Sequence, residues 1–378
     1  MSAILTLNAG SSSIKFAVYT QAVAPELVGA GQVERIGGDA RLKVDGTSTA
    51  IDAGNHASAV QAILVAIRPM LGRGHVAVVG HRIVHGGPDF SAPMELTPDV
   101  LQTLAGLVPL APLHQPHNLA AVSAAQAAFP DAVQVGCFDT AFHQGHAFAN
   151  DTYGLPRAYY EQGIRRYGFH GLSYDYISGV LRQNEPHLAP GRLIIAHLGN
   201  GASLCGLRDG RSISTTMGFS ALDGLAMGTR CGQIDPGVIL YLLDQGMGAP
   251  ELTDLLYRQS GMLGLSGISH DMRTLLECDA PEAAQALDYY IERLRREIGA
   301  MAATLGGIDA LVFCGGVGEN AGAIRARAVE GLAFLGLEID GPANDANAQD
   351  IGTGAARILV IPTDEELVIA RAATALLT

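Results

Sequence analysis

The chain opens with two hydrophobic segments separated by a polar, glycine-containing turn. Apolar and polar residues alternate from Ala3 to Leu7, and a second apolar segment extends from Ile14 to Tyr19. Alternation with a period of two is typical of a strand with one buried face. The two segments and the turn between them, residues 8–13, therefore predict a β-hairpin.

A similar pattern returns near the middle of the chain. It consists of a strand at 192–198, a glycine turn at 199–202, a strand from Ser203, a turn at 208–211 and a strand at 212–216. Two units of strand, glycine turn and strand, about half a chain apart, favour an internally duplicated protein.

The remaining pattern alternates between helical and strand periodicity. We expect helices at 57–71, 236–245, 280–305, 321–334 and 365–377, and strands at 76–79, 133–138, 310–313 and 357–361. Strands that alternate with helices along the chain indicate an α/β protein.

Length, composition and charge narrow the class of protein. A chain of 378 residues with 48% hydrophobic residues is long enough for two domains with sizeable cores. The net charge of −13, without a basic block, argues against binding to nucleic acid or to an anionic membrane. Five widely separated cysteines favour reduced thiols, and neither a signal peptide nor a membrane span is expected.

Three glycine-rich turns that follow apolar strands are candidates for phosphate binding, because their backbone N–H groups can form anion-binding nests. The sequence has no P-loop motif. The turn within Asn8–Lys15 adds three hydroxyls and an ammonium group, although a polar hairpin without a ligand would look the same. The Gly316-x-Gly318 turn resembles half of a dinucleotide fingerprint but lacks its third glycine.

Histidines and arginines gather in three polar clusters, at 80–87, 113–118 and 167–171. Paired histidines without a carboxylate are weak evidence for zinc. Arg82 and Arg230 are better candidates for recognising a carboxylate or phosphoryl group, because a guanidinium offers a fork of donors. Either arginine alone could equally form a surface ion pair.

Taken together, several segments resemble the acetate kinase family in their order along the chain. They are Asn8–Lys15, Gly80–Gly87, Phe138–His143, Arg165–Gly171, His197–Ser203, Met217–Pro236 and Gly315–Asn320. The resemblance implies an α/β fold with two duplicated ribonuclease-H-like domains, as in actin and sugar kinases, around an interdomain nucleotide cleft. We expect domains at 1–147 and 148–362, with a C-terminal helix at 363–378 packing back on the first.

The resemblance also implies an activity and its reactants. We expect a cytoplasmic, homodimeric enzyme that reversibly transfers the γ-phosphoryl group of ATP to acetate, giving acetyl phosphate and ADP, with Mg²⁺ or alternatively Mn²⁺. Two other hypotheses stay open: a propionate kinase, and a nucleotide-driven binding protein that does not phosphorylate a small molecule.

Roles are implied for residues that match the family's motifs. The catalytic residues would be Arg82, Asp139, His170 and Arg230, and the acyl-pocket residues Arg82, Val84, Leu113, Phe169 and Ala221, the last where the family usually has proline. The nucleotide would contact Ser11, Ser13, Lys15, His197, Asn200, Gly201, Asp271, Arg273, Gly316, Val317 and Asn320. Asn8 and Glu365 would face the metal, with Glu366 as the rival of Glu365, and Met272 replaces the usual aromatic residue.

Overall fold

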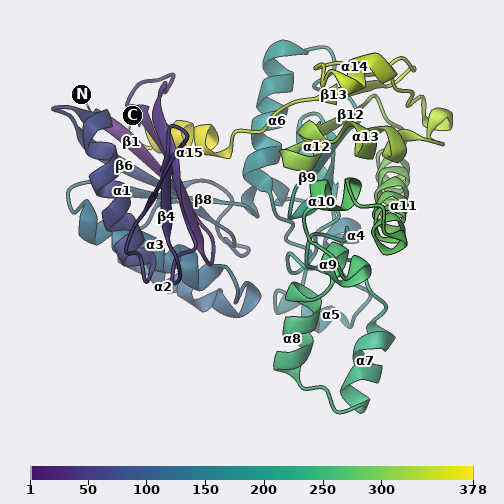
Figure 1. The fold of residues 1–378 in the computed structure, drawn as a ribbon, viewed down its shortest axis with the longest axis horizontal. Helices are drawn as coiled ribbons and strands as arrows, with labels where there is room; N and C mark the ends of the chain where they lie inside the picture. The colour runs from purple at the N-terminus through teal and green to yellow at the C-terminus, as the bar shows by residue number, and fades with distance from the viewer. Residues whose placement is uncertain (1, 378) are drawn as a thin grey trace. The chain divides into compact units, whose positions relative to one another are not determined.

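The computed structural model describes residues 2–377 and divides into two compact units, each with its own β-sheet (Figure 1). Unit 1 comprises Met1–Phe142 and Asp364–Thr378, and unit 2 comprises His143–Thr363. The chain therefore passes from unit 1 to unit 2 and returns for its last helix. Within residues 2–377, no helix combines the length and the apolar composition needed to cross a bilayer.

Unit 1 is built on an eight-stranded sheet. In spatial order its strands are β5 (Thr47–Ala50), β4 (Arg41–Val44), β3 (Leu27–Glu34), β2 (Ser13–Thr20), β1 (Ser2–Ala9), β6 (His75–Ile83), β8 (Val133–Phe138) and β7 (Met94–Glu95). Its helices are α1 (His56–Leu71), α2 (Pro98–Gly106), α3 (Gln115–Ala128) and α15 (Glu365–Ala375). The first two strands form the predicted hairpin, in which Asn8 pairs with Lys15.

Helices cover both faces of this sheet. On one face, apolar residues of β1, β2 and β6 form a core with α1 and α3, and Val79 belongs to this core. The next residue, Gly80, faces α15 on the other side, where a Cβ atom would lie 2.4 Å from Cγ2 of Ile369. Neighbouring residues of a strand point to opposite faces. The close approach of α15 therefore requires glycine at position 80.

Unit 2 has a five-stranded sheet and most of the helices. The strand order is β11 (Arg211–Thr215), β10 (Ala202–Arg208), β9 (Leu193–Leu198), β12 (Ala310–Cys314) and β13 (Arg357–Val360). The helices are α4 (Phe148–Asp151), α5 (Arg157–Glu161), α6 (Gly171–Asn184), α7 (Pro236–Asp244), α8 (Ala249–Arg258), α9 (Gly261–Ser266), α10 (Met272–Leu276), α11 (Pro281–Leu305), α12 (Gly315–Asn320), α13 (Gly322–Val329) and α14 (Gly341–Asp345).

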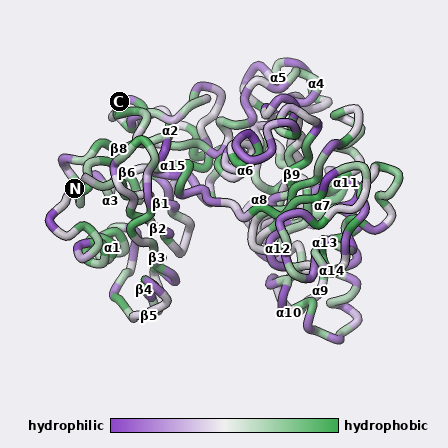
Figure 2. The backbone as a smooth tube through the Cα atoms, turned by 90° about the horizontal axis from the view of Figure 1, so that it is seen from above, coloured by the Kyte–Doolittle hydropathy of each residue, from purple (hydrophilic) through white to green (hydrophobic). Residues whose placement is uncertain are grey.

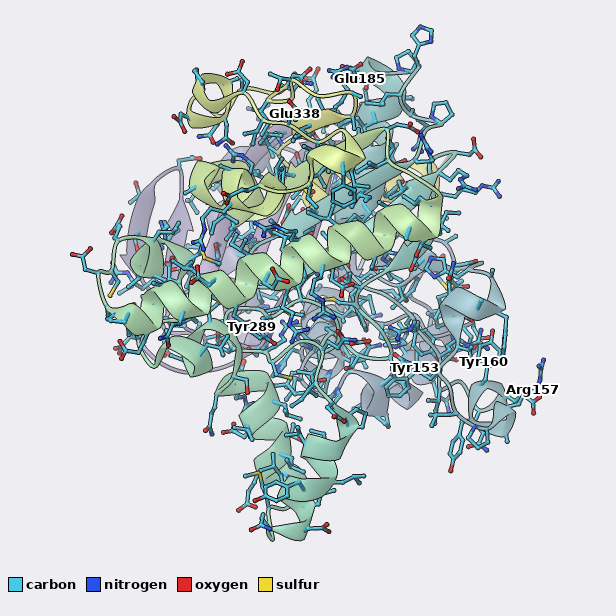
Figure 3. All side chains as sticks on the ribbon, turned by 90° about the vertical axis from the view of Figure 1, so that its right-hand side faces the viewer. Tyr153, Arg157, Tyr160, Glu185, Tyr289 and Glu338 are labelled. Atoms are coloured by element: carbon cyan, nitrogen blue, oxygen red, sulfur yellow. The ribbon has the colours of Figure 1, made fainter. Side chains whose placement is uncertain are left out.

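Two helices sandwich the unit 2 sheet. The long helix α11, which runs unbroken in Figure 3, packs on β10, where a Cβ atom at Gly206 would lie 2.6 Å from Sδ of Met301. On the same strand, Ser203 bonds Tyr174 of α6. Ser203 and Gly206 are three residues apart on one strand, so α6 and α11 lie on opposite faces of the sheet.

The two sheets share one topology. In unit 1 the order β3-β2-β1-β6-β8 has two antiparallel pairings followed by two parallel pairings. The order β11-β10-β9-β12-β13 in unit 2 repeats these directions in the same sequence. This repetition confirms the predicted fold class, an α/β protein with two duplicated ribonuclease-H-like units. Figure 2 shows the backbone coloured by the hydropathy of each residue.

Some elements differ from the sequence-based expectation. The strand at 133–138 has the predicted bounds, whereas the strand predicted at 76–79 extends over His75–Ile83. The helix predicted at 321–334 was wrong in its extent, because it ends at Val329. The glycine segment Gly315–Asn320, expected as a turn, forms a short helix of its own.

Candidate functional site

The central feature of the candidate site in unit 1 is an ion pair between Arg82 and Asp139. Arg82 lies near the end of β6 and Asp139 directly follows β8, its parallel neighbour, so the two side chains emerge at the same sheet edge. Nη2 of Arg82 lies 2.6 Å from Oδ2 of Asp139, and Nε lies 3.0 Å from Oδ1. The Asp139 side chain is only 1% exposed, whereas that of Arg82 is 20% exposed, so the carboxylate is shielded from water and the guanidinium reaches the surface.

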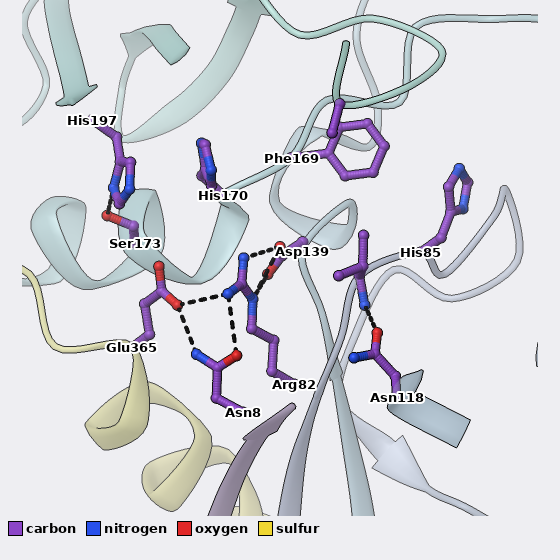
Figure 4. A network of polar contacts seen from close by, with 12 residues as sticks. Asn8, Arg82, His85, Asn118, Asp139, Phe169, His170, Ser173, His197 and Glu365 are labelled. Carbon is purple, nitrogen blue, oxygen red and sulfur yellow. Dashed lines mark hydrogen bonds and ion pairs between the residues drawn. The ribbon is translucent and has the colours of Figure 1, made fainter. Parts of the chain in front are cut away.

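Asn8 and Glu365 complete this group (Figure 4). Nη1 of Arg82 donates to Oδ1 of Asn8 at 3.2 Å and lies 3.5 Å from Oε2 of Glu365. Nδ2 of Asn8 also donates to that Glu365 oxygen, at 3.4 Å. Burial alone would lower the pKa of Arg82, but the charges of Asp139 and Glu365 raise it above its ordinary value. Arg82 is therefore a permanent cation between two carboxylates.

Glu365 and its neighbour Glu366 begin helix α15, and they differ in their surroundings. Asp364 caps the helix by accepting a hydrogen bond from the Leu367 N–H at 2.9 Å. Glu365 is the residue that approaches Arg82. Burial, and then the charge of Glu365, raise the pKa of Glu366, while Lys15 opposes the shift. Glu365 is therefore the carboxylate that meets Arg82 directly, while Glu366 lies in a setting where burial and its neighbour disfavour its charge.

The first glycine turn presents its polar groups at the end of the hairpin. Gly10 N donates to Ser13 O at 2.8 Å, which closes the turn between β1 and β2. Ser11 and Lys15 are exposed and Ser13 is half-buried. Lys15 is the cross-strand partner of Asn8, so their side chains lie on the same face of the sheet.

Val84 and Leu113 are the acyl-pocket candidates in unit 1. Val84 is buried and Leu113 half-buried. Asn118, to which the sequence analysis gave no role, fixes the segment that carries Val84: its Oδ1 accepts from Val84 N at 2.9 Å, and its Nδ2 donates to Ala9 O at 2.7 Å. Gln115 similarly binds the backbone of His85: its Oε1 accepts from the His85 N–H, and its Nε2 donates to the His85 carbonyl. The polar cluster at 113–118 was visible in the sequence, but the backbone groups that these side chains bind were not, because they are distant along the chain.

Four of the predicted residues in unit 2 come together around β9 and β10. The rings of His170 and His197 stack with centroids 4.3 Å apart. Nδ1 of His170 lies 2.8 Å from Oγ of Ser203. Nδ1 of His197 lies 2.8 Å from Oγ of Ser173, and Figure 4 marks this bond with a dashed line. A Cβ atom at Gly201 would lie 3.2 Å from Nε2 of His170 and 3.9 Å from Nη1 of Arg230.

A cavity of about 480 Å³ in unit 2 gathers most of the predicted nucleotide-binding residues. Asn200, Asp271, Arg273, Gly316, Val317 and Asn320 line it, together with Met272. Its size lies within the range of pockets for small ligands. The exposed ion pair between Asp271 and Arg273, 2.9 Å long, stands at this cavity.

A buried arginine that the sequence analysis overlooked supports one wall of the cavity. Arg325 is fully buried on α13 and donates from Nη1 to the carbonyl groups of Gly318 and Glu319, in the last turn of α12. Its other donors reach Asn344 and Asn347. Cationic groups are favourable at the C-terminal end of a helix, so Arg325 holds the short helix that carries Gly316 and Val317.

The alternative of a histidine metal site finds no support in the described part of the chain. Within residues 2–377, no three histidine, cysteine, aspartate or glutamate side chains are grouped to hold an ion. His81 instead donates from Nε2 to Oε1 of Gln134 at 2.8 Å, inside the sheet.

Comparison with known proteins shows a match along nearly the whole chain. The model of the acetokinase family matches residues 3–371. The chain is 52% identical to the acetate kinase of Methylocella silvestris over 394 aligned residues, covering 99% of this chain and 98% of that protein.

Solved structures agree with this match. The crystal structure of Porphyromonas gingivalis acetate kinase is similar with a TM-score of 0.90 and 35% identity, covering 100% of both chains. A propionate kinase from Francisella tularensis is similar with a TM-score of 0.92 and 35% identity, covering 98% of this chain and 99% of the other.

The buried histidines predict a pH-dependent stability. Burial lowers the pKa of His81 and His85 to about 4 and that of His143 to about 3, so all three are neutral when folded at pH 7. In the unfolded chain they bind protons below about pH 6.5. The free energy of unfolding should therefore fall as the pH drops below about 6.5, by about 1.4 kcal/mol per pH unit for each histidine.

Urea unfolding at pH 7.5, 6.5 and 5.5 measures this loss. A His81→Gln variant is the control, since its stability should fall less steeply with pH, by about one proton. Equal stabilities at pH 5.5 and 7.5 would contradict the prediction.

Proposed function

This chain belongs to the acetokinase family, and from that premise we propose that it is an ATP-dependent acetate phosphotransferase. It transfers the γ-phosphoryl group of ATP to acetate, reversibly and with Mg²⁺, giving acetyl phosphate and ADP. The runner-up substrate is propionate, because a propionate kinase is among the similar structures.

The observation that carries this proposal is the fixed guanidinium of Arg82. Asp139 holds it through two nitrogen atoms, while Nη1 is directed to Asn8 and Glu365. A guanidinium fixed in this way is preorganised, because its plane and charge are oriented before an anionic group arrives. Arg82 lies among residues that match the family's motifs, which is where a carboxylate or phosphoryl oxygen is expected.

The reaction needs positioned charge more than covalent help. A carboxylate oxygen of acetate attacks the γ-phosphorus in line, the bond to the β,γ-bridging oxygen breaks, and its electron pair leaves with ADP. Arg82 and Arg230 neutralise the carboxylate and the equatorial phosphoryl oxygens, and His170 donates a hydrogen bond to the phosphoryl group. Acetate is already ionised at pH 7, so Asp139 acts by orienting Arg82 rather than as a general base.

Oxygen ligands for Mg²⁺ are present in unit 1. Asn8 and Glu365 are neighbours, with Nδ2 of Asn8 donating to Oε2 of Glu365, and each side chain carries an oxygen that can bind a metal ion. Mg²⁺ is commonly held by one or two carboxylates, with waters and substrate phosphates completing its shell. These residues fit the ion and would hold it. When bound, the ion supplies neutralisation of the phosphate charge.

The proposed nucleotide contacts lie in two places: the two glycine turns and the cavity in unit 2. We propose that Ser11, Ser13 and Lys15 bind phosphate at the first turn, and His197, Asn200 and Gly201 at the second. Asp271, Arg273, Gly316, Val317 and Asn320 line the cavity of about 480 Å³ and would contact the adenosine end. Met272 is buried in the same wall and offers an apolar thioether surface to the base.

We also propose a homodimeric enzyme in the cytoplasm, where ATP is available to it. Helix α7 supports an assembly, because none of its residues is buried and its apolar side chains Val238, Leu240, Tyr241 and Leu243 are 41–62% exposed. Clustered apolar side chains of this kind mark association surfaces.

Trapping of acyl phosphate with hydroxylamine tests the activity. With ATP and Mg²⁺, we expect acyl hydroxamate from acetate, less from propionate and little from butyrate. ADP release without hydroxamate from any acid would leave a nucleotide-driven binding protein as the better hypothesis, and a higher kcat/KM for propionate would overturn the acetate assignment.

The two arginines give a second prediction. Arg82→Ala and Arg230→Ala should each lower kcat by roughly 10²–10³, since each removes a preorganised charge that stabilises the transition state. Arg157→Ala, which removes a 73% exposed arginine, is the matched control and should retain normal kcat. Folded Arg82 or Arg230 variants with near-normal turnover would show that these roles are wrong.

Ala221 gives a third prediction, about the acyl pocket. Its carbonyl accepts from Nη1 of Arg230 at 3.0 Å, which places it beside a proposed substrate contact. Ala221→Pro adds ring atoms there and should raise the ratio of kcat/KM for acetate over propionate by roughly tenfold, which is the low end of the discrimination of one methylene by an apolar pocket, about 1–3 kcal/mol. Ala221→Gly is the control. An unchanged ratio in Ala221→Pro would show that this position does not shape the pocket.

A further inference from the structure

The segment 168–170, which carries His170, has an unfavourable backbone conformation that contacts with other segments must stabilise. His170 has a left-handed conformation, with φ of 60°, directly before helix α6. Such a conformation is costly for a residue with a Cβ atom and persists only where the surroundings impose it. Gly168, two residues earlier, also has a positive φ of 72°, and a Cβ atom there would lie 2.6 Å from Cδ2 of His143. The His143 ring is thus packed directly against this backbone.

His143 also bonds this segment. It is 2% exposed, and its Nε2 lies 2.9 Å from the carbonyl oxygen of Phe169, the residue before His170. On the other side of the ring, Nδ1 lies 2.9 Å from Oγ of Ser212 on β11. His146 reaches the same hydroxyl, with Nε2 2.7 Å from Oγ.

These contacts determine where the protons lie. A carbonyl oxygen only accepts, so Nε2 of His143 carries the hydrogen. Burial and the nearby His146 lower the pKa of His143 to about 3, so the ring is neutral and its Nδ1 is an acceptor. The Ser212 hydroxyl therefore donates to His143 and accepts from Nε2 of His146. The three hydrogen bonds run in one direction, from His146 to the carbonyl of Phe169.

The imidazole ring of His170 has a separate support. Its Nδ1 is bonded to Oγ of Ser203, which in turn bonds the hydroxyl of Tyr174. Nε2 lies close to Gly201 of the second glycine turn, where a Cβ atom would be 3.2 Å away. Ser203 thus sets the rotation of the ring, while the contacts of His143 set the backbone from which the ring projects.

We propose that His143 is a positioning residue, which acts through the Phe169 carbonyl to hold His170 in the place from which it reaches the transferred phosphoryl group. Ser212 and His146 fix the ring of His143 in the tautomer that can donate to that carbonyl. The inference rests on the proposed role of His170.

Two amide variants distinguish the role of Nε2, which bonds Phe169, from that of Nδ1, which bonds Ser212. A glutamine amide nitrogen can take the place of Nε2, so His143→Gln keeps a donor to the Phe169 carbonyl, whereas His143→Asn keeps a partner for Ser212 and loses that donor. We expect His143→Asn to lower kcat by about 10²-fold, the order of loss that a misplacement of about 1 Å causes. His143→Gln should stay within about tenfold of the parent, and the KM for ATP should be unchanged in both.

The decisive measurement is a double-mutant cycle with His170→Ala. If His143 acts through His170, His143→Asn should cost almost nothing further in kcat once His170 is alanine. An equal loss with and without His170 would mean a merely structural role and would overturn the inference alone. Near-normal kcat in His170→Ala would overturn the role of His170 in the proposed function, and the inference with it.

A milder variant covers the case in which His143→Asn does not fold. Ser212→Ala removes the hydroxyl that orients the His143 ring, together with the contacts of that hydroxyl to His146 and Cys205, and thermal unfolding checks that the fold is kept. We expect a smaller loss of kcat, about three- to tenfold, which disappears in the His170→Ala background. A loss that persists in that background, or no loss at all, contradicts the inference.

Discussion

The ion pair between Arg82 and Asp139 is the contact on which the candidate site of unit 1 depends. Asp139 is almost fully buried, and a buried carboxylate needs a cation and hydrogen-bond donors to remain charged. Removing one partner of a buried pair typically costs about 3–5 kcal/mol, because the other charge is left uncompensated. The parallel pairing of β6 and β8 brings the two residues to one edge, and the position of Arg82 then orients Asn8 and Glu365. The pairing of β6 with β8 therefore determines where the guanidinium of Arg82 lies.

Unit 2 orients its site histidines through hydroxyl groups of neighbouring elements. His170 is bonded to Ser203 of β10, and His197 is bonded to Ser173 of α6. A hydroxyl group can both donate and accept, so it can pair with an imidazole nitrogen in either role. The sheet and helix α6 therefore set the rotation of these two rings.

Local patterns in the sequence predicted the sheets well, because strand periodicity and glycine turns are local properties. The hairpin at the N-terminus and the strand at 133–138 were both recognised in this way. The break between α12 and α13 could not be recognised from local patterns. It depends on hydrogen bonds from Arg325 to the Gly318 carbonyl group and to Asn344, which is distant in the chain. Nor could sequence decide between Glu365 and Glu366: neighbouring helical residues project about 100° apart, and only packing determines which one meets Arg82. The roles of the site residues came from the family resemblance, whereas the supports Asn118 and His143 emerge only when distant segments are brought together.

The return of the chain to unit 1 for helix α15 has a consequence for how the protein folds during synthesis. Ile369 of this helix covers Gly80 and closes one face of the first sheet, and Glu365 at its start lies beside Arg82. On the ribosome, the strands of unit 1 emerge first, yet this face stays uncovered until all of unit 2 has been made. Contacts between residues so distant in the chain form slowly, because closing a long loop costs entropy before the contact is gained. Unit 2 is one continuous segment and has all its strands and helices once residue 363 is made. We therefore expect unit 1, whose strands are made first, to complete its fold last.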